Sequence, residues 1–226
     1  MYIKRGKYHI VSNPFHPRTL IDISQENIAE YEKALDTLST ILGEDFSWRL
    51  AGGLAIAVTI GRWYRVHRDI DILVSINDFS VLIEKARMHG YALFSRPWWV
   101  RLPLHRKIDI YKASTPSDAL NDTSQCLRLV KVDGNETIMK HIDLLHHIDI
   151  YIYCIVDGEM VFAKFPRRLP TTCLDGRTYT TRSGRKMPVV HLKYIERVKS
   201  IGFGRVDRHD LAQIRMWALS QNSPSH

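Results

Sequence analysis

The sequence has few of the residues and runs that mark several large classes of protein. Its 226 residues include 3 cysteines, 12 glycines and 9 prolines. Three widely spaced cysteines make neither a disulfide framework nor a zinc site, so we expect a reduced, cytoplasmic protein. The low glycine and proline content excludes collagen-like and low-complexity chains. No apolar run approaches the roughly 18 residues that span a bilayer, and residues 1–17 lack the apolar core of a signal peptide, so we expect no membrane association.

Positive charge exceeds negative charge. There are 32 Lys and Arg residues against 24 Asp and Glu residues, which gives a formal net charge of +8 at pH 7. A positive field favours polyanionic partners such as nucleotides and nucleic acids. A basic surface that serves only solubility would give the same count, so the charge alone assigns no function.

Helical and strand-like patterns alternate along the chain. Apolar residues at spacings of three and four predict helices over residues 24–42, 54–60, 79–89, 187–201 and 207–219. Runs rich in β-formers predict strands over residues 46–50, 70–74, 91–94, 98–102 and 107–111, and a hairpin within 149–165 that turns at Asp157-Gly158. The fold class is therefore mixed α+β, a small mixed sheet flanked by helices, with a β-rich extension and C-terminal helices.

Three aspartates stand in apolar, strand-like runs. Asp69 and Asp71 are two residues apart, so the alternation of a strand points both carboxylates to one face. A divalent cation between two such charges relieves their repulsion, and an all-oxygen ligand set favours Mg²⁺ over zinc. Asp109 lies between two isoleucines in another strand-like run. If that strand lies beside the first, the three carboxylates form a cluster that can hold two metal ions.

A double glycine precedes these aspartates. Gly52-Gly53 follows a short strand-like run and opens a helix. Because glycine lacks a Cβ atom, the pair lets a phosphate approach the N–H groups of the helix N-terminus. An ordinary strand-to-helix turn can have the same letters, so the evidence for a phosphate and metal site is the order of the motifs along the chain.

These motifs resemble the nucleotidyltransferase superfamily, which shares its fold with DNA polymerase beta. The family pattern is G-[GS], then D-x-D on the next strand, then a third Asp, and here it reads Gly52-Gly53, Asp69-Ile-Asp71 and Asp109. The run over residues 53–71 is most similar to aminoglycoside and lincosamide nucleotidyltransferases and to abortive-infection toxin enzymes. A weaker similarity covers residues 191–211.

The resemblance implies a domain organisation and a set of site residues. Residues 20–135 would form the nucleotidyltransferase catalytic core, and residues 136–226 a β-rich extension and helical part packed on it as one unit. Asp69, Asp71 and Asp109 would bind the metal ions and catalyse the reaction, with Asp109 as a candidate general base. The nucleotide-binding residues that we expect are Gly52, Gly53, Arg62 and Lys199, where Arg62 is chosen because it follows the helix that the double glycine opens.

The activity that the resemblance implies is the Mg²⁺-dependent transfer of a nucleoside monophosphate from an NTP to a hydroxyl of a small, antibiotic-like molecule, with release of pyrophosphate. Two Mg²⁺ ions and an NTP co-substrate are expected. Two alternatives stay open: a toxin-type enzyme that modifies tRNA or another RNA, and a non-catalytic protein that binds nucleotides or nucleic acid on the same scaffold.

Other side chains allow both a functional and a structural interpretation. His67 could orient a metal-binding aspartate or be an ordinary loop histidine, and one of Trp98 and Trp99 could stack on a base or an acceptor ring. Asp207 and Asp210 share a helix face and are expected to pair with Arg205 or Lys199. Three histidines fit a helix surface better than a zinc site: His141, His146 and His147.

Overall fold

The computed structural model describes most of the chain. The described residues are 2–14, 23–67, 69–102, 106–121, 126–134, 138, 147–162, 168–202 and 204–221. Within them helices and strands alternate as the sequence predicted, and the fold class is mixed α+β. None of the described helices combines the length and the apolar character needed to cross a membrane.

A ten-stranded sheet forms the centre of the fold. Its main path runs in the order β1-β2-β6-β5-β7-β8-β4-β3, and β9 and β10 extend it from β8. The β4–β8 pair is parallel and the other described strand pairs of this sheet are antiparallel, so the sheet is mixed. Its strands are β1 Tyr2–Arg5, β2 Tyr8–Pro14, β3 Trp48–Ala51, β4 Ile70–Ser75, β5 Tyr91–Leu102, β6 Arg106–Ala113, β7 Cys126–Lys131, β8 His147–Val156, β9 Glu159–Phe162 and β10 Arg168–Pro170.

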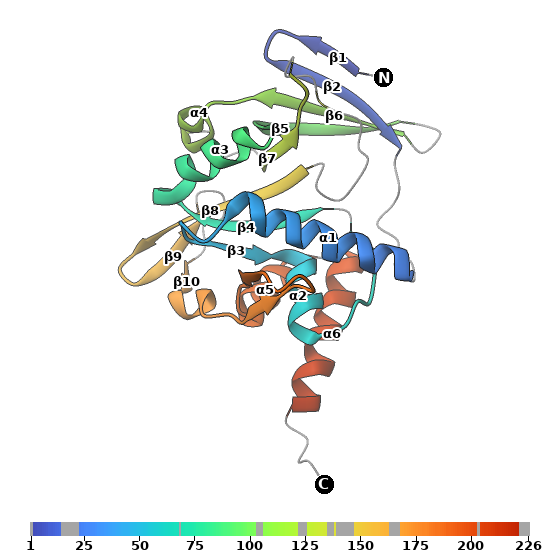
Figure 1. Ribbon diagram of the computed structural model, residues 1–226, viewed down its shortest axis with the longest axis vertical. Helices are drawn as coiled ribbons and strands as arrows, with labels where there is room; N and C mark the ends of the chain where they lie inside the picture. Colours follow the sequence, from blue (N-terminus) through green and yellow to red (C-terminus); the bar gives the residue numbers. More distant parts are fainter. Residues whose placement is uncertain are drawn as a thin grey trace.

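Helices cover the sheet unevenly. Figure 1 shows α2, α5 and α6 gathered at the β3 end of the sheet, whereas the β1–β2 hairpin lies at the opposite end. The helices are α1 Gln25–Leu42, α2 Gly52–Ile60, α3 Phe79–Met88, α4 Pro116–Asn121, α5 Leu192–Lys199 and α6 Arg205–Gln221. A separate two-stranded sheet consists of β11 (Thr178–Thr180) and β12 (Lys186–Pro188).

Local sequence signals account for several of these elements. Ser24 caps α1 and exchanges side-chain and backbone hydrogen bonds with Asn27 in a capping box, and Gly43 ends the helix, so α1 agrees with the helix predicted over residues 24–42. Asp157 and Gly158 both have positive φ in the turn between β8 and β9, which confirms the predicted hairpin. The helix expected from residue 187 was wrong, because Lys186–Pro188 pairs with β11 and α5 begins only at Leu192.

Strand β8 is a central strand of the sheet. It pairs on one side with β7 and on the other with β4. Its residues Ile148, Ile150 and Ile152 are 0–6% exposed and belong to the main hydrophobic core. The domain boundary expected near residue 135 stays a proposal, but the sheet joins residues from both sides of it.

The segment after β10 returns to the sheet at β3. Val190 N–H donates to the Leu50 carbonyl over 3.0 Å, and Leu50 forms a parallel bridge with Val189. Gly176 makes this return possible, because a Cβ atom at this residue would lie 1.7 Å from the Val189 carbonyl oxygen. The region that leads into α5 thus depends on a close contact between two backbone segments.

We therefore expect Gly176→Ala to destabilise the fold. The added methyl group must push the Val189 backbone away, and overpacking of this kind lowers the free energy of unfolding by about 1–3 kcal/mol. Urea denaturation followed by circular dichroism measures the change. Gly134→Ala is the matched control, since a Cβ atom at Gly134 meets no other atom within 4 Å. Equal stability of the two variants would contradict the tight contact.

Candidate functional site

A cleft opens where the β3–α2 turn, β4 and β8 meet the C-terminal helices. Its volume is about 270 Å³. The double glycine and the loop before β4 form one part of its wall, and α5 and the start of α6 form another. Its charged lining residues are Arg65, Asp69, Asp71, Asp149, Lys199 and Asp207. The cleft therefore brings together residues from both ends of the chain.

Two adjacent strands bring three of these carboxylates to the cleft. Asp71 on β4 lies directly opposite Asp149 on β8 in the parallel register, and Asp69 immediately precedes β4. All three residues line the cleft. The Tyr151 hydroxyl, also on β8, donates to Asp71 Oδ1 over 3.2 Å. The strand alternation that placed Asp69 and Asp71 on one face in the sequence analysis thus also places Asp149 beside them.

The negative charge of this cluster changes the protonation of Asp71. Burial, followed by the nearby charges of Asp69 and Asp149, raises the pKa of Asp71 to about 8. The positive charge of Lys199 and the hydrogen bond from Tyr151 act in the opposite direction but do not cancel these effects. Burial and the neighbouring carboxylates thus make the charged form of Asp71 costly, and Lys199 and Tyr151 offset only part of this cost.

The structure does not bring Asp109 to this cluster. Asp109 lies on β6, where its backbone partners are Val11 on β2 and Trp99 on β5. Three strands, β5, β7 and β8, separate β6 from β4. At about 4.8 Å per strand, the two backbones are roughly 19 Å apart, which is farther than an aspartate side chain reaches. The expectation that the strand of Asp109 lies beside the strand of Asp69 and Asp71 was therefore wrong, although the Asp109 side chain itself lies outside the described atoms.

Asp149 is also held by a buried arginine. Arg128 on β7 is the direct cross-strand partner of Asp149. Its Nε donates to Asp149 Oδ1 over 2.5 Å and its Nη2 to Oδ2 over 2.6 Å. Both side chains are under 9% exposed. Arg128 therefore fixes the Asp149 carboxylate beside Asp71 and compensates its charge.

The double glycine is required by the packing of the site. Gly52 has a φ of +66°, and a Cβ atom there would lie 1.9 Å from Asp71 Oδ2. A Cβ atom at Gly53 would lie 2.2 Å from Arg65 Nη2. The missing side chains therefore leave room for Asp71 and Arg65, and both glycines still line the cleft at the first turn of α2.

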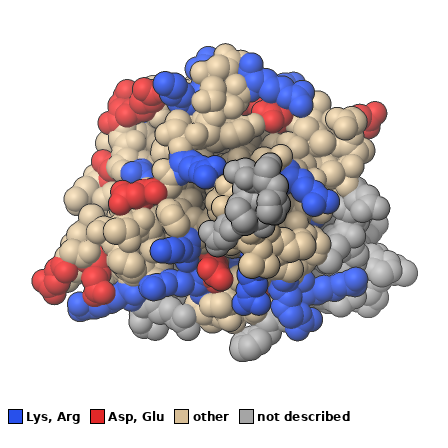
Figure 2. Space-filling model, turned by 90° about the horizontal axis from the view of Figure 1, so that it is seen from below, with Lys and Arg blue, Asp and Glu red and all other residues tan. Residues whose placement is uncertain are grey.

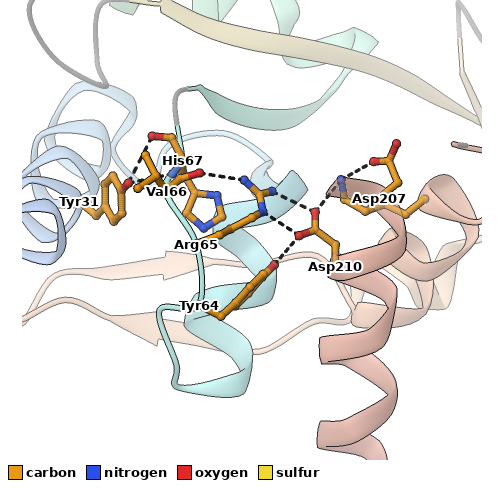
Figure 3. A network of polar contacts seen from close by, with 8 residues as sticks. Tyr31, Tyr64, Arg65, Val66, His67, Asp207 and Asp210 are labelled. Carbon is orange, nitrogen blue, oxygen red and sulfur yellow. Dashed lines mark hydrogen bonds and ion pairs between the residues drawn. The ribbon is translucent and has the colours of Figure 1, made fainter. Parts of the chain in front are cut away.

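A buried polar network connects the loop before β4 to α5 and α6 (Figure 3). Its centre is Asp210 on α6, which is 0% exposed. Arg65 donates to both Asp210 oxygens, over 2.7 and 2.9 Å, and the Tyr64 hydroxyl donates to Oδ1 over 3.0 Å. Lys199 lies 2.8 Å from Oδ2. Burial alone would raise the pKa of Asp210, but the hydrogen bonds and charges of Arg65 and Lys199 lower it below its usual value.

Lys199 lies at the junction of this network and the cleft. Its Nζ also donates to Asp207 Oδ1 over 3.0 Å, so the expected pairing of Asp207 and Asp210 with Lys199 is confirmed. Burial would lower the pKa of Lys199, but the two aspartates raise it above its usual value. Lys199 is therefore a positive charge in the wall of the cleft, as a residue that binds a nucleotide requires.

His67 has a structural position. It is 4% exposed, and its ring packs edge-on against Tyr31 and Tyr64. Burial lowers the pKa of His67 well below its usual value, and the charge of Arg65 lowers it further, so the ring is neutral near pH 7. Its backbone N–H donates to the Tyr31 hydroxyl oxygen over 2.8 Å. The structural interpretation of His67 therefore agrees with its surroundings.

Arg62 is not among the described residues that line the cleft. It is exposed and follows Gly61, the residue that ends α2. The nine residues of α2 place it roughly 13 Å along the helix axis from the double glycine. The charge that the sequence analysis looked for at Arg62 is supplied in the cleft by Arg65.

Several other candidates lie outside the described part of the structure. His141 and His146 are not described, and for Trp98, Trp99 and His147 only the backbone strand position is described. The structure therefore does not test the functional roles considered for these residues, but it places His147 at the start of β8, so the helix-surface interpretation of His147 was wrong.

The donor set of the cleft fits a magnesium ion. Asp69 and Asp71 offer carboxylate oxygens, and a cation would stabilise the charged form of Asp71, whose pKa is raised by burial and by the charges of Asp69 and Asp149. Among the described side chains, no set of three or more His, Cys, Asp or Glu already forms a metal-binding group. Magnesium is usually held by one or two carboxylates together with water and substrate phosphates, so two aspartates meet its requirement.

Known proteins show similarity to part or most of the chain. Residues 33–135 match the family described as aminoglycoside-2''-adenylyltransferase. No curated protein sequence matches the chain. Lincosamide antibiotic adenylyltransferase LnuA bound to lincomycin is 15% identical, with 86% of this chain and 98% of that chain covered and a TM-score of 0.47. ANT(2'')-Ia in complex with adenylyl-2''-tobramycin is 14% identical, with 88% and 91% covered and a TM-score of 0.40.

The family match includes the most informative motifs. It contains Gly52-Gly53, Asp69, Asp71 and Asp109, and it ends before Asp149. It therefore supports the motifs at the start of the site and does not bear on the third carboxylate. On this match, the segment of residues 33–135 belongs to the nucleotidyltransferase superfamily, with aminoglycoside adenylyltransferases among its relatives, as the double glycine and the Asp-x-Asp motif predicted.

Proposed function

We propose that the protein is a metal-dependent nucleotidyltransferase that moves a nucleoside monophosphate from an NTP to a hydroxyl of a small molecule. The acceptor oxygen bonds to the α-phosphorus, the bond from that phosphorus to pyrophosphate breaks, and the hydroxyl proton passes to a base. The observation that carries the proposal is the cleft in which Asp69, Asp71 and Asp149 meet the double glycine and Lys199. The family match of residues 33–135 supports it.

The triphosphate would bind at the N-terminal end of α2. This helix begins at Gly52, and its N-cap residue Ala51 has no side-chain group that accepts hydrogen bonds from the first N–H groups. Lys199 and Arg65 add positive charge to the same cleft. Figure 2 views the molecule from the side of α2, α5 and α6, and Lys and Arg side chains are spread over this face. Such a field favours the approach of an anionic nucleotide.

Asp69 and Asp71 would hold Mg²⁺. When bound, the ion neutralises phosphate charge and stabilises the leaving pyrophosphate. Arg128 donates to both oxygens of Asp149 and so weakens this carboxylate as a ligand for a second cation. We therefore propose one ion held by Asp69 and Asp71 in place of the two expected from the sequence. Asp149, in the position expected for Asp109, would orient the acceptor hydroxyl, whose proton would pass to water in the cleft.

The first prediction concerns turnover. With Mg²⁺ and one of the four NTPs, the protein should release pyrophosphate in the presence of an acceptor, and EDTA should weaken NTP binding as well as turnover. Asp71→Asn should lower the rate about 100-fold or more, because several kcal/mol of charge stabilisation is lost. Glu84→Gln, on the exposed face of α3, is the control.

The measurement is mass spectrometry of acceptors incubated with each NTP. The acceptor panel contains an aminoglycoside, a lincosamide and a pool of tRNA. If the tRNA gained mass and the small molecules stayed unmodified, the proposal of a small-molecule acceptor would be wrong, and the toxin-type activity would take its place. Full turnover by Asp71→Asn would remove Asp71 from the reaction.

The second prediction separates the two candidates for the third carboxylate. Asp149→Asn should abolish turnover, and Asp109→Asn should leave it unchanged, because only the strand of Asp149 lies beside β4. Since Asp149→Asn leaves the buried Arg128 charge without its carboxylate, the double variant Asp149→Asn/Arg128→Gln is assayed in parallel. Thermal melting verifies that each variant is folded. Loss of activity in Asp109→Asn with activity retained in Asp149→Asn would reverse the assignment.

The third prediction concerns pH. An unfolded Asp has a pKa near 3.8, and the folded pKa of Asp71 is about 8. Its contribution to stability is therefore present below the unfolded pKa and is lost as the pH rises through the folded pKa. The negative charge of Asp71, with which Mg²⁺ would pair, appears as the pH rises through this folded pKa. Mg²⁺ should therefore increase the Tm more at about pH 9 than at about pH 6.5.

Differential scanning fluorimetry with and without Mg²⁺ measures this difference. The pH dependence of the Mg²⁺ effect should disappear in Asp71→Asn and persist in Glu84→Gln. An equal Mg²⁺ effect at both pH values in the wild type would mean that Asp71 is not the group whose ionisation controls binding.

A further inference from the structure

A second cavity lies beside the cleft. Its volume is about 500 Å³, and it lies between the β9–β10 hairpin and α5. Tyr194, Val198 and Gly202 line both this cavity and the cleft. A molecule bound here would therefore be next to the carboxylates, on the side of α5. We call this cavity the α5 groove.

The walls of the α5 groove are mainly apolar. Phe162 and Leu169 form one side, and Tyr194, Val198 and Ile201 form the other. Val198 and Ile201 are each 38% exposed, so apolar surface faces water in the groove. Apolar surface of this kind at the edge of a polar cleft is typical of a site that binds the carbon skeleton of a ligand.

The charged residues of the groove all have the same sign. They are Arg168 on β10 and Arg197 in the last turn of α5, and no acidic residue is among the described residues that line it. Among the described residues, Arg168 forms two long ion pairs, of 3.8 Å to Asp157 and 3.6 Å to Glu159. Arg197 is exposed. The groove would therefore repel a polycation and attract an anion.

From this chemistry we propose that the α5 groove binds the acceptor, and that the acceptor is an amphipathic hydroxyl compound with an apolar body and an acidic group. Its apolar body lies between β9 and α5, its acidic group faces Arg168 and Arg197, and its hydroxyl points to the cleft. The proposal rests on the proposed function for the reaction itself. It also separates this protein from enzymes whose acceptors are polycationic aminoglycosides.

Two fluorescent probes with the same apolar body test the charge preference. Dansylglycine carries a carboxylate, and dansylcadaverine carries an ammonium group. We expect dansylglycine to bind at least about threefold more tightly, since a partly exposed charge pair contributes up to about 1 kcal/mol. Binding is measured by titration of dansyl fluorescence. Equal or tighter binding of dansylcadaverine, or binding of neither probe, would overturn the proposal.

A matched pair of variants locates the effect in the groove. Arg197→Glu should weaken dansylglycine about three- to fivefold and strengthen dansylcadaverine, because it reverses one charge of the groove. Arg87→Glu is the control: Arg87 is also exposed and in the last turn of its helix, α3, so the cost at the helix terminus is the same. An equal effect of the two variants would contradict binding in the α5 groove.

MgATP binding and pyrophosphate release are measured in the same preparations. If the protein binds MgATP and releases pyrophosphate but Arg197→Glu does not change the affinity for either probe, the acceptor proposal is wrong and the proposed function stands. If the probes bind as expected but no NTP binds, the proposed function fails and the groove remains a binding site for anionic amphipathic molecules.

Discussion

The buried carboxylate of Asp210 is the contact on which the geometry of the site depends. It receives hydrogen bonds from Tyr64 and Arg65, before β4, and it pairs with Lys199 at the end of α5. Such a group is costly to bury alone, and removal of one partner from a buried ion pair typically costs about 3–5 kcal/mol. The loop that leads to Asp69 and Asp71 and the helices that close the cleft are therefore fixed relative to one another by one side chain. The guanidinium of Arg65 also lies against Gly53, which connects the same contact to the start of α2.

Local signals in the sequence were sufficient for the first part of the site. The spacing of apolar residues predicted α1, and the order of strand, double glycine, helix and Asp-x-Asp strand predicted β3, α2 and β4. These elements are contiguous in the chain, so their packing follows from local patterns. The ion pair of Arg65 with Asp210 joins residues that are 145 positions apart in the sequence. No local pattern indicates with which carboxylate an arginine pairs.

The third carboxylate illustrates the same limit in another way. The letters Ile-Asp-Ile-Tyr occur twice, at residues 108–111 and at residues 148–151. Both runs form strands, β6 and β8, and each presents its aspartate in the same local setting. Only the order of strands in the sheet distinguishes them, and this order depends on long-range pairing, the parallel contact of β4 with β8. A search for a repeated motif would have identified Asp149 as a second candidate, but not as the better one.

Charge is distributed differently at the site and over the chain. The protein has a formal net charge of +8, whereas acidic side chains outnumber basic ones among the residues that line the cleft. A long-range positive field attracts an anionic nucleotide, but a triphosphate that reaches the carboxylates meets charges of its own sign. The divalent cation that we propose would resolve this conflict, because Asp69 and Asp71 would attract it and it would in turn attract the phosphates. Arg168 and Arg197 line the α5 groove, whereas Asp69, Asp71 and Asp149 line the cleft and not the groove, so an acidic group of the proposed acceptor would bind on the side of the arginines. In the function that we propose, the cleft would bind a metal-bound phosphate, and the α5 groove would bind the molecule that receives the nucleotide.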